Sequence, residues 1–340
     1  MLPRAACLVP VPCDGFGCAH GTSQVPEVYR HPVERYRIPS FVSLEDYVEF
    51  PQATNLTMPR SQRPVSSPTS LPLCDGPKLH RFTHYKAPIQ WLERLDSDGE
   101  RPGSEGYVFR AKIRDEEYAI KVFKFFDPHE QDYFWASLLG RNTSLQTAAY
   151  YTDPFYAECR AYGRIQEAVR KKRLKPNIAV QCHGFLFLEE DDAQRLRTNY
   201  NIDLALDEVD PEFQQKAIGG YQVRAIVKSL ASQNTGVHQD SLGSILKGLK
   251  ALNKHKIYVM DVRLDNYRDG MIVDFGSSWT EPYPPLDAMD NWTATSSRTT
   301  DPVLFDEMVE VEKIPNPKDV RATRNFNYCK RLRPRKKASH

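Results

Sequence analysis

One stretch of the sequence, YVMDVRLDNYRDGMIVDFG (Tyr258–Gly276), constrains the fold more than any other. Its pattern predicts a short strand, a turn and a second strand that bring Asp261, Asn266 and Asp274 together. Carboxylate and carboxamide oxygens that converge on one point are the ligands of a hard cation such as Mg²⁺, especially where phosphate oxygens complete the shell. The stretch therefore predicts a metal–nucleotide site, provided that the rest of the chain forms a place for the nucleotide.

The distribution of proline indicates where the folded body lies. The chain has 340 residues, enough for one large domain or two lobes, and most of its 25 prolines fall in the first 90 and the last 60 residues. We therefore expect residues 1–76 to be a Pro/Ser-rich, largely disordered region and residues 311–340 to be a basic disordered tail.

Several classes of protein are disfavoured by the composition. There is no run of 18 apolar residues, and prolines interrupt the N-terminus where a signal peptide needs a continuous apolar segment, so we expect neither a membrane protein nor a secreted one. The seven cysteines are irregularly spaced, which favours a reducing compartment. Cys13, Cys18 and His20 lack a second pair of ligands at zinc-site spacing, which disfavours a zinc site.

Positive charge is concentrated at the C-terminal end in KRLRPRKK, whereas the rest of the chain is net negative. The segment predicts a nuclear address or a contact with DNA phosphate, and the composition does not support a nucleic-acid-binding surface over the whole protein. The basic residues of the segment are Lys330, Arg331, Arg333, Arg335, Lys336 and Lys337.

Periodicity predicts the main elements of the middle region. EGYVFRAKIRDEEYAIKVFKFF alternates as two strands of a hairpin, and IAVQCHGFLFL and YQVRAIVKSLA predict two further strands. A helix is expected after Asp153, with Pro154 at its first position and apolar residues at helical spacing. A second helix is expected after Asp240 or Ser241, directly before the stretch described first.

A glycine loop, a lysine and a glutamate precede that stretch in an order typical of nucleotide binding. In RPGSEGYV, Gly103, Gly106 and Val108 match the last part of G-x-G-x-x-G-x-V, in which glycines let backbone amides approach phosphate, although Arg101 replaces the first glycine. In YAIKVF, Lys121 takes the position of a lysine that pairs with α- and β-phosphates, and Glu158 on the following helix is its expected partner. A pair of ordinary surface residues is disfavoured because Lys121 lies within an apolar strand.

The order of these pieces resembles the protein-kinase fold. VMDVRLDN keeps the spacing of H-R-D-L-x-x-x-N, which implies that Asp261 is the catalytic base and Asn266 a metal ligand, and Asp274 begins a D-F-G that implies a second metal ligand. Arg263 stands where a lysine often contacts phosphate. The implied cofactors are ATP and Mg²⁺.

The sequence also departs from the kinase pattern. Val259 and Met260 replace the His-Arg pair, and no A-P-E segment follows. The expected fold is therefore α+β, a two-lobed protein-kinase-like domain at residues 77–310, with an insertion-bearing N-lobe at 77–235 and a reduced C-lobe at 236–310.

A closer resemblance covers about residues 85 to 310. The blocks YAIKVFKFFDP, YYTDPFYAECRAYGRI, CHGFLFL, VRAIVKSLAS and IYVMDVRLDNYRDGMIVDFGSSWTEP are similar to the Fta-two subunit family of the fungal Sim-four kinetochore complex. The resemblance implies a nuclear, inner-kinetochore protein at the centromere, with other kinetochore subunits as partners and a kinase-like fold.

Three functions follow as alternatives. The first is a kinase-fold scaffold that binds kinetochore partners, that is, a pseudokinase. The second is an active atypical kinase for a protein or small-molecule acceptor, favoured by retention of Lys121, Glu158, Asp261, Asn266 and Asp274. The third, a nucleic-acid binder acting through the tail, lacks aromatic interleaving and any module that reads a groove.

Overall fold

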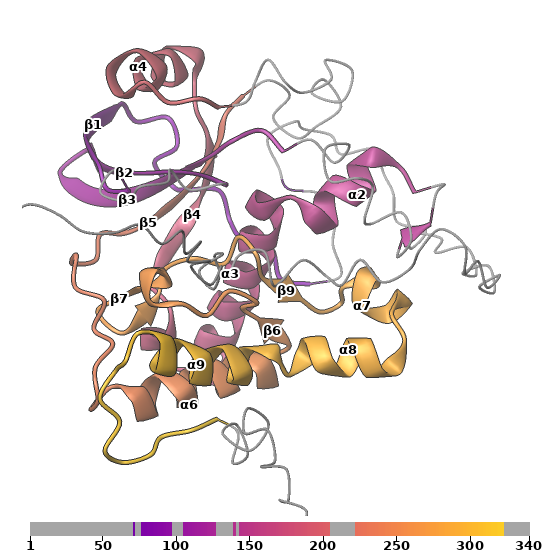
Figure 1. The fold of residues 1–340 in the computed structure, drawn as a ribbon. Coiled ribbons are helices and arrows are strands. Elements are labelled where there is room, and N and C mark those ends of the chain that lie inside the picture. The colour runs from indigo at the N-terminus through magenta and orange to yellow at the C-terminus, as the bar shows by residue number, and fades with distance from the viewer. Residues whose placement is uncertain are drawn as a thin grey trace, which may run out of the picture. The chain divides into compact units, whose positions relative to one another are not determined.

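The computed structural model describes residue 71 and residues 76–96, 105–126, 139–140, 143–204 and 222–322. By internal contacts the chain divides into residues 1–52 and 53–340, and every described residue belongs to the second unit. In this unit the fold is mixed α/β: a five-stranded antiparallel sheet is combined with seven α-helices among the described residues (Figure 1).

The sheet has the strand order β1-β2-β3-β5-β4, and every neighbouring pair is antiparallel. β2 and β3 form the hairpin that the sequence predicts, with Val108 opposite Lys121. The two further predicted strands are also confirmed, and the later one lies between β3 and β4. The strands are β1 (Ile89–Arg94), β2 (Gly106–Ile113), β3 (Glu116–Phe123), β4 (Cys182–Phe187) and β5 (Arg224–Ser229).

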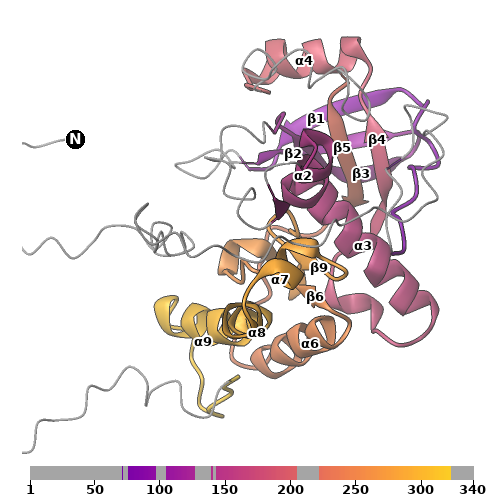
Figure 2. The same cartoon turned by 90° about the vertical axis from the view of Figure 1, so that its right-hand side faces the viewer.

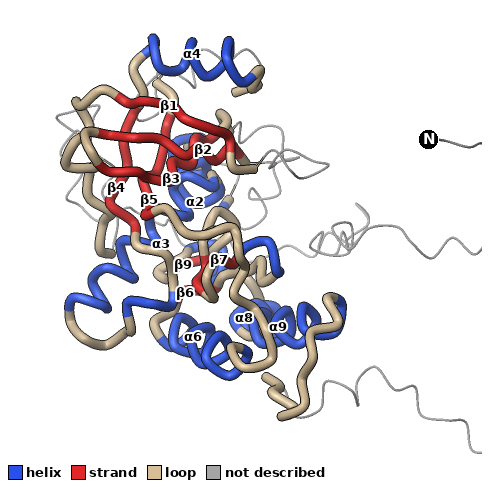
Figure 3. The backbone as a smooth tube through the Cα atoms, turned by 90° about the vertical axis from the view of Figure 1, so that its left-hand side faces the viewer, coloured by secondary structure: helices blue, strands red, loops and turns tan. Residues whose placement is uncertain are grey.

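The two faces of the sheet pack against different helices because successive side chains of a strand point to opposite faces. On β3, Ile120 and Val122 join a core cluster that includes residues of α4 (Glu190–Tyr200). Lys121 and Phe123 point to the other face, where Phe123 joins the cluster that contains α3. Figures 2 and 3 show α4 above the sheet, whereas α3 extends below it. The alternation therefore places Lys121 on the face that α3 covers.

The helix α3 (Pro154–Arg170) begins as the sequence predicts. The Asp153 carboxylate accepts a hydrogen bond of 2.8 Å from the Phe155 amide, and Pro154 occupies the first turn. The other Asp153 oxygen forms a buried ion pair with Arg224 on β5, so the start of α3 is anchored to the sheet. α3 directly follows α2 (Leu145–Thr152).

The second predicted helix, α6 (Leu242–Lys254), is confirmed with Ser241 at its N-cap position. It carries an apolar stripe that packs into the same cluster as α3, because residues three or four apart share one face of a helix.

Short strands, one helical turn and three helices follow α6. They are β6 (Ile257–Tyr258), η3 (Leu264–Asn266), β7 (Tyr267–Arg268), β8 (Met271–Ile272), β9 (Trp279–Thr280), α7 (Pro284–Ala288), α8 (Asn291–Arg298) and α9 (Thr300–Val311). The turn η2 (Pro176–Ile178) lies between α3 and β4.

The helices after Gly276 are more extensive than the sequence indicates. α8 is capped by Asp290, whose carboxylate accepts hydrogen bonds from two backbone amides, and α9 packs its apolar side chains against α6. The described chain continues past the expected boundary at residue 310 to residue 322, where the Ala322 amide donates to Asp306 Oδ1 at 2.7 Å. Within the described part of the chain, no helix has the length and apolar character needed to cross a membrane.

Candidate functional site

Lys121 lies at the centre of a buried group of charges. Its ammonium contacts three carboxylates: Asp274 Oδ1 at 2.6 Å, Glu105 Oε2 at 3.1 Å and Glu158 Oε2 at 3.1 Å. Burial acts to lower the pKa of Lys121, but the three carboxylates, Asp274 first among them, outweigh it and raise the pKa above its ordinary value. Among the described residues, these three carboxylates therefore hold Lys121 in its charged form.

Glu158 is the expected partner of Lys121, and the structure places the two in contact. The Glu158 side chain is fully buried on α3 and bridges two lysines, since its second oxygen pairs with Lys228 on β5. Lys228 also donates to the Val273 carbonyl at 2.7 Å. Because a buried charge is costly without a partner, this bridge joins α3 to two strands of the sheet and to the chain before Asp274.

Asp274 is held by several groups at once. Its Oδ1 accepts from Lys121 and from the Gly276 amide at 2.8 Å. Burial acts to raise the pKa of Asp274, but the charges of Lys121 and Lys228 outweigh it and lower the pKa below its ordinary range. The next residue, Phe275, is buried and packs edge-to-face on Tyr162 of α3, at 5.1 Å between ring centroids. The Asp-Phe-Gly segment is thus fixed against the sheet by charge and against α3 by packing.

Asp261, Asn266 and Arg263 form a separate hydrogen-bonded group. Asn266 is buried and donates from Nδ2 to the Asp261 carbonyl and to Asp261 Oδ2, both at 2.9 Å. Arg263, which is exposed, lies 3.2 Å from the same carboxylate oxygen through Nε. The structure therefore brings Asp261 and Asn266 together. Asn266 and Arg263 both hold the Asp261 carboxylate in place.

The backbone before Asp261 is positioned by Asp301 at the start of α9. This fully buried carboxylate accepts hydrogen bonds of 2.8 Å from the amides of Val259 and Met260 and from Asn253 Nδ2. Burial raises the pKa of Asp301, although these hydrogen bonds act to lower it. Met260 has φ +64°, a left-handed conformation that non-glycine residues adopt at a cost. Asp301 holds this unfavourable turn in place.

The predicted glycine loop is described only in part. Gly103 and Arg101 lie outside the described residues, whereas Gly106 and Val108 lie on β2. A Cβ built on Gly106 would come within 2.2 Å of the Val122 carbonyl oxygen. Close approach of β2 to β3 is therefore sufficient reason for a glycine at residue 106.

The residues that would hold ATP and Mg²⁺ fit such a group in residue type. A lysine paired with a buried glutamate suits phosphate, and Asn266 and Asp274 carry oxygen ligands for Mg²⁺. In the described ranges, no three Asp, Glu, His or Cys side chains converge into a metal centre of their own. A cation at Asn266 and Asp274 would thus need further ligands, such as phosphate oxygens.

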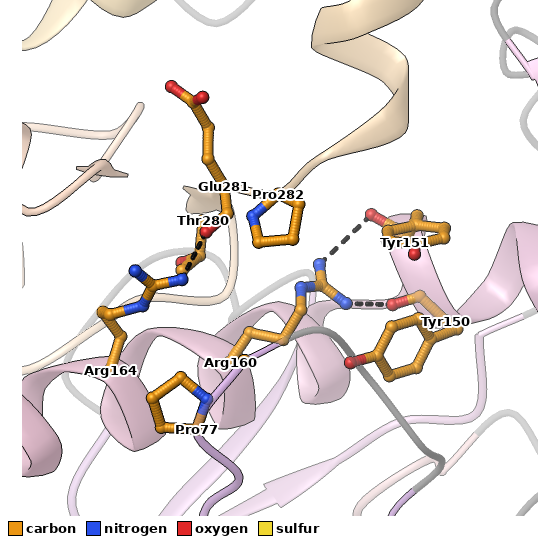
Figure 4. A pocket seen from close by; sticks show the side chains of 9 residues that line it. Pro77, Tyr150, Tyr151, Arg160, Arg164, Thr280, Glu281 and Pro282 are labelled. Carbon is orange, nitrogen blue, oxygen red and sulfur yellow. Dashed lines mark hydrogen bonds between the residues drawn. The ribbon is translucent and has the colours of Figure 1, made fainter. Parts of the chain in front are cut away.

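A hollow elsewhere on α3 contains none of the expected site residues (Figure 4). Arg160 donates to the carbonyls of Tyr150 and Tyr151, and Arg164 donates to the Glu281 carbonyl at 2.6 Å. The Arg160 guanidinium lies 4.9 Å from the ring centroid of Tyr150. Both arginines therefore tie α3 to neighbouring segments through main-chain oxygens.

Three residues of the site were not predicted from the sequence: Glu105, Lys228 and Asp301. Lys228 directly follows the apolar run at residues 225–227 on β5, but that local pattern does not show which strand β5 pairs with. Glu105 directly precedes Gly106 in the glycine segment. Asp301 carried no local signal, because its contacts come from residues more than 40 positions earlier in the chain. The basic tail residues 330–337 lie outside the described part of the chain.

The fold and site together define a mixed α/β protein in which a buried cluster of charged side chains joins a five-stranded sheet to a helix and to an Asp-Phe-Gly segment. A family model described as kinetochore Sim4 complex subunit FTA2 matches residues 67–279. The chain therefore belongs to this family, and the family resemblance expected from the sequence is confirmed. Comparison with curated proteins gives no match.

Proposed function

We propose that this protein is a kinetochore subunit whose kinase-like body acts mainly as a structural, partner-binding component at the centromere. Membership of the FTA2 family supports a place in the kinetochore, and hence in the nucleus and in chromosome segregation. It also implies other kinetochore subunits as partners.

The kinase-like character of the body is part of this proposal. It is supported by the order of the pieces: Lys121 on a hairpin, Glu158 on the following helix, then Asp261 with Asn266, and then Asp274. On this view residues 77–235 correspond to an N-lobe and residues 236–310 to a reduced C-lobe.

One observation favours the structural role over the enzymatic one: carboxylates of this chain already surround the lysine that would bind phosphate. Lys121 Nζ donates hydrogen bonds to Glu105 and Asp274 and forms an ion pair with Glu158, all within 3.1 Å. The second lysine of the cluster, Lys228, is paired with Glu158 and the Val273 carbonyl. Such a cluster links the sheet, α3 and the Asp-Phe-Gly segment, and it stabilises the body as it stands.

An active phosphotransferase is the alternative, favoured by the retained Asp261 and Asn266 pair. Lys121 and Glu158 would then position phosphates, and Asn266 and Asp274 would hold Mg²⁺, which supplies charge stabilisation when bound. Asp261 would accept the proton of an acceptor hydroxyl, and Arg263 would contact phosphate. Met260 in place of the arginine that reads an activation-loop phosphate argues for the structural role.

The basic tail is a second point of contact in this proposal. The six basic residues between Lys330 and Lys337 suit a nuclear address or a salt-dependent contact with DNA phosphate. Such a contact would be independent of base sequence, because phosphate carries no sequence information.

The proposal is tested by recovering the tagged full chain from cells in which it replaces the native copy. We expect wild type and Asp261→Asn to recover the same kinetochore subunits in the same amounts, because the substitution removes the base but keeps the side-chain shape. Equal circular dichroism spectra and thermal midpoints would show that both chains are folded. A folded Asp261→Asn chain that no longer recovers these subunits would contradict the structural role.

A further inference from the structure

The carboxylate of Glu105 differs from the other two on Lys121. Glu158 is fully buried on α3, whereas the Glu105 side chain is 24% exposed and lies directly before β2. Its backbone is fixed by the Lys124 amide, which donates to the Glu105 carbonyl at 3.0 Å. For the carboxylate to leave Lys121 only the Glu105 side chain has to rotate, so Glu105 is the partner of Lys121 that can leave without unfolding a helix.

The structure leaves room for this carboxylate by the absence of a side chain at residue 276. A Cβ built on Gly276 would lie 1.8 Å from Glu105 Oε2, closer than any real contact. The adjacent Ser277 hydroxyl donates to the other oxygen, Glu105 Oε1, at 3.2 Å. Glu105 therefore reaches across from β2 to the Asp-Phe-Gly segment and is bound at both oxygens.

The negative charge of Glu105 sets the net charge of the cluster that an anionic ligand would meet at Lys121. With all groups ionised, Lys121 and Lys228 face three carboxylates, so the cluster has one excess negative charge. Without the Glu105 charge the cluster is balanced, and Lys121 has a free N–H donor. Burial raises the pKa of Glu105, although the charge of Lys121 acts to lower it.

We propose that Glu105 is a specificity-determining residue that occupies the place of a phosphate group on Lys121 and excludes phosphate-bearing ligands until it moves away. The inference rests on the proposed kinase-like site. It assigns the ligand class of the opened site as a nucleoside triphosphate with a divalent cation. Apparent affinity falls in proportion to the fraction of molecules in the open state, so a closed state that predominates tenfold weakens binding tenfold.

The test measures the thermal midpoint of the full chain against increasing Mg²⁺ and ATP. Glu105→Ala removes the carboxylate, and Glu190→Ala on α4 is the matched control, since Glu190 is exposed and belongs to another element. We expect Glu105→Ala to bind at least tenfold more tightly than wild type, equal to about 1.4 kcal/mol. Glu190→Ala should behave as wild type.

A second variant opens the site without changing any charged residue. Gly276→Ala places a methyl group where Glu105 Oε2 lies, and the flexible end of that side chain must move. We expect this variant to strengthen ATP binding in the same direction as Glu105→Ala. Adding Lys121→Met to Glu105→Ala should remove the response, because the phosphate then has no lysine.

Two results would overturn the inference. One is an equal ATP response in wild type and Glu105→Ala, which would mean that Glu105 excludes nothing. The other is a folded Glu105→Ala chain with no response. Recovery of kinetochore subunits by the same variants is measured in a separate experiment. A failure of Glu105 to exclude phosphate is therefore distinguishable from a failure of the proposed structural role.

Discussion

Replacing Glu158 with glutamine should destabilise the protein strongly. The residue is fully buried and bridges Lys121 and Lys228, which are 4% and 5% exposed. Glu158→Gln keeps the shape but removes the negative charge. Lys121 keeps two other carboxylates, whereas Lys228 has no other ion pair among the described residues and keeps the Val273 carbonyl as a neutral acceptor.

The magnitude follows from the position of Lys228. Breaking a buried ion pair by removing one partner costs about 3 to 5 kcal/mol, because the other charge stays buried. For a folded body of this size the loss corresponds to a fall in thermal midpoint of roughly 6 to 20 °C. We expect urea unfolding of the full chain at neutral pH to show the loss of about 3 to 5 kcal/mol in the free energy of unfolding. Glu167→Gln on the same helix is the control, since its ion pair with Lys171 is exposed to solvent and should contribute little to stability.

A double variant separates the stranded charge from other effects of the substitution. Lys228→Met in the Glu158→Gln background removes the unpaired ammonium and supplies apolar volume, so part of the lost stability should return. A loss under about 1 kcal/mol for Glu158→Gln, or a double variant less stable than the single one, would mean that no buried charge is stranded at Lys228.

Three further predictions concern other parts of the chain. Asp301→Ala should cost roughly 3 kcal/mol in urea unfolding, because it leaves the amides of Val259 and Met260 without their acceptor; an unchanged midpoint would contradict this. The lowered pKa of Asp274 gives stability that is complete above its ordinary pKa of 3.8 and is lost as pH falls towards the folded-state pKa, so from pH 5 to pH 3 wild type should lose more stability than Asp274→Asn. Parallel losses would exclude this linkage. Deleting residues 330–340 should lower the nuclear fraction of the tagged chain, and an unchanged distribution would remove the role of the tail as an address.

The sequence predicts most of the sheet and the helix α3, because their signals are local. Alternation marks β2 and β3, and Asp153 with Pro154 marks the start of α3. Lys121, Glu158 and Asp274 could be proposed as one group because each falls in a recognisable spacing. Their partner Lys228 could not, since its position depends on β5 pairing between β3 and β4, which is a long-range choice.

The C-terminal helices, by contrast, have weak local signals in the sequence. α7 and α8 are short and lack a long apolar stripe: α8 is capped by Asp290 and contacts α9, while Leu286 of α7 and Ala294 of α8 join a small core cluster with Tyr258 and Tyr283. Asp301 is invisible to motif reasoning for the same reason, because a buried carboxylate that holds distant backbone amides has no fixed spacing from them.

We propose that this chain serves the kinetochore through its fold and its partners rather than through phosphate transfer. The rate of chromosome loss tests this in cells whose only copy of the chain carries Asp261→Asn, with a deletion of the gene as the reference. We expect a loss rate equal to that of wild type, with the variant at normal abundance. A loss rate close to that of the deletion, from a variant that is folded and recovers its kinetochore partners, would contradict it and establish a need for the Asp261 carboxylate.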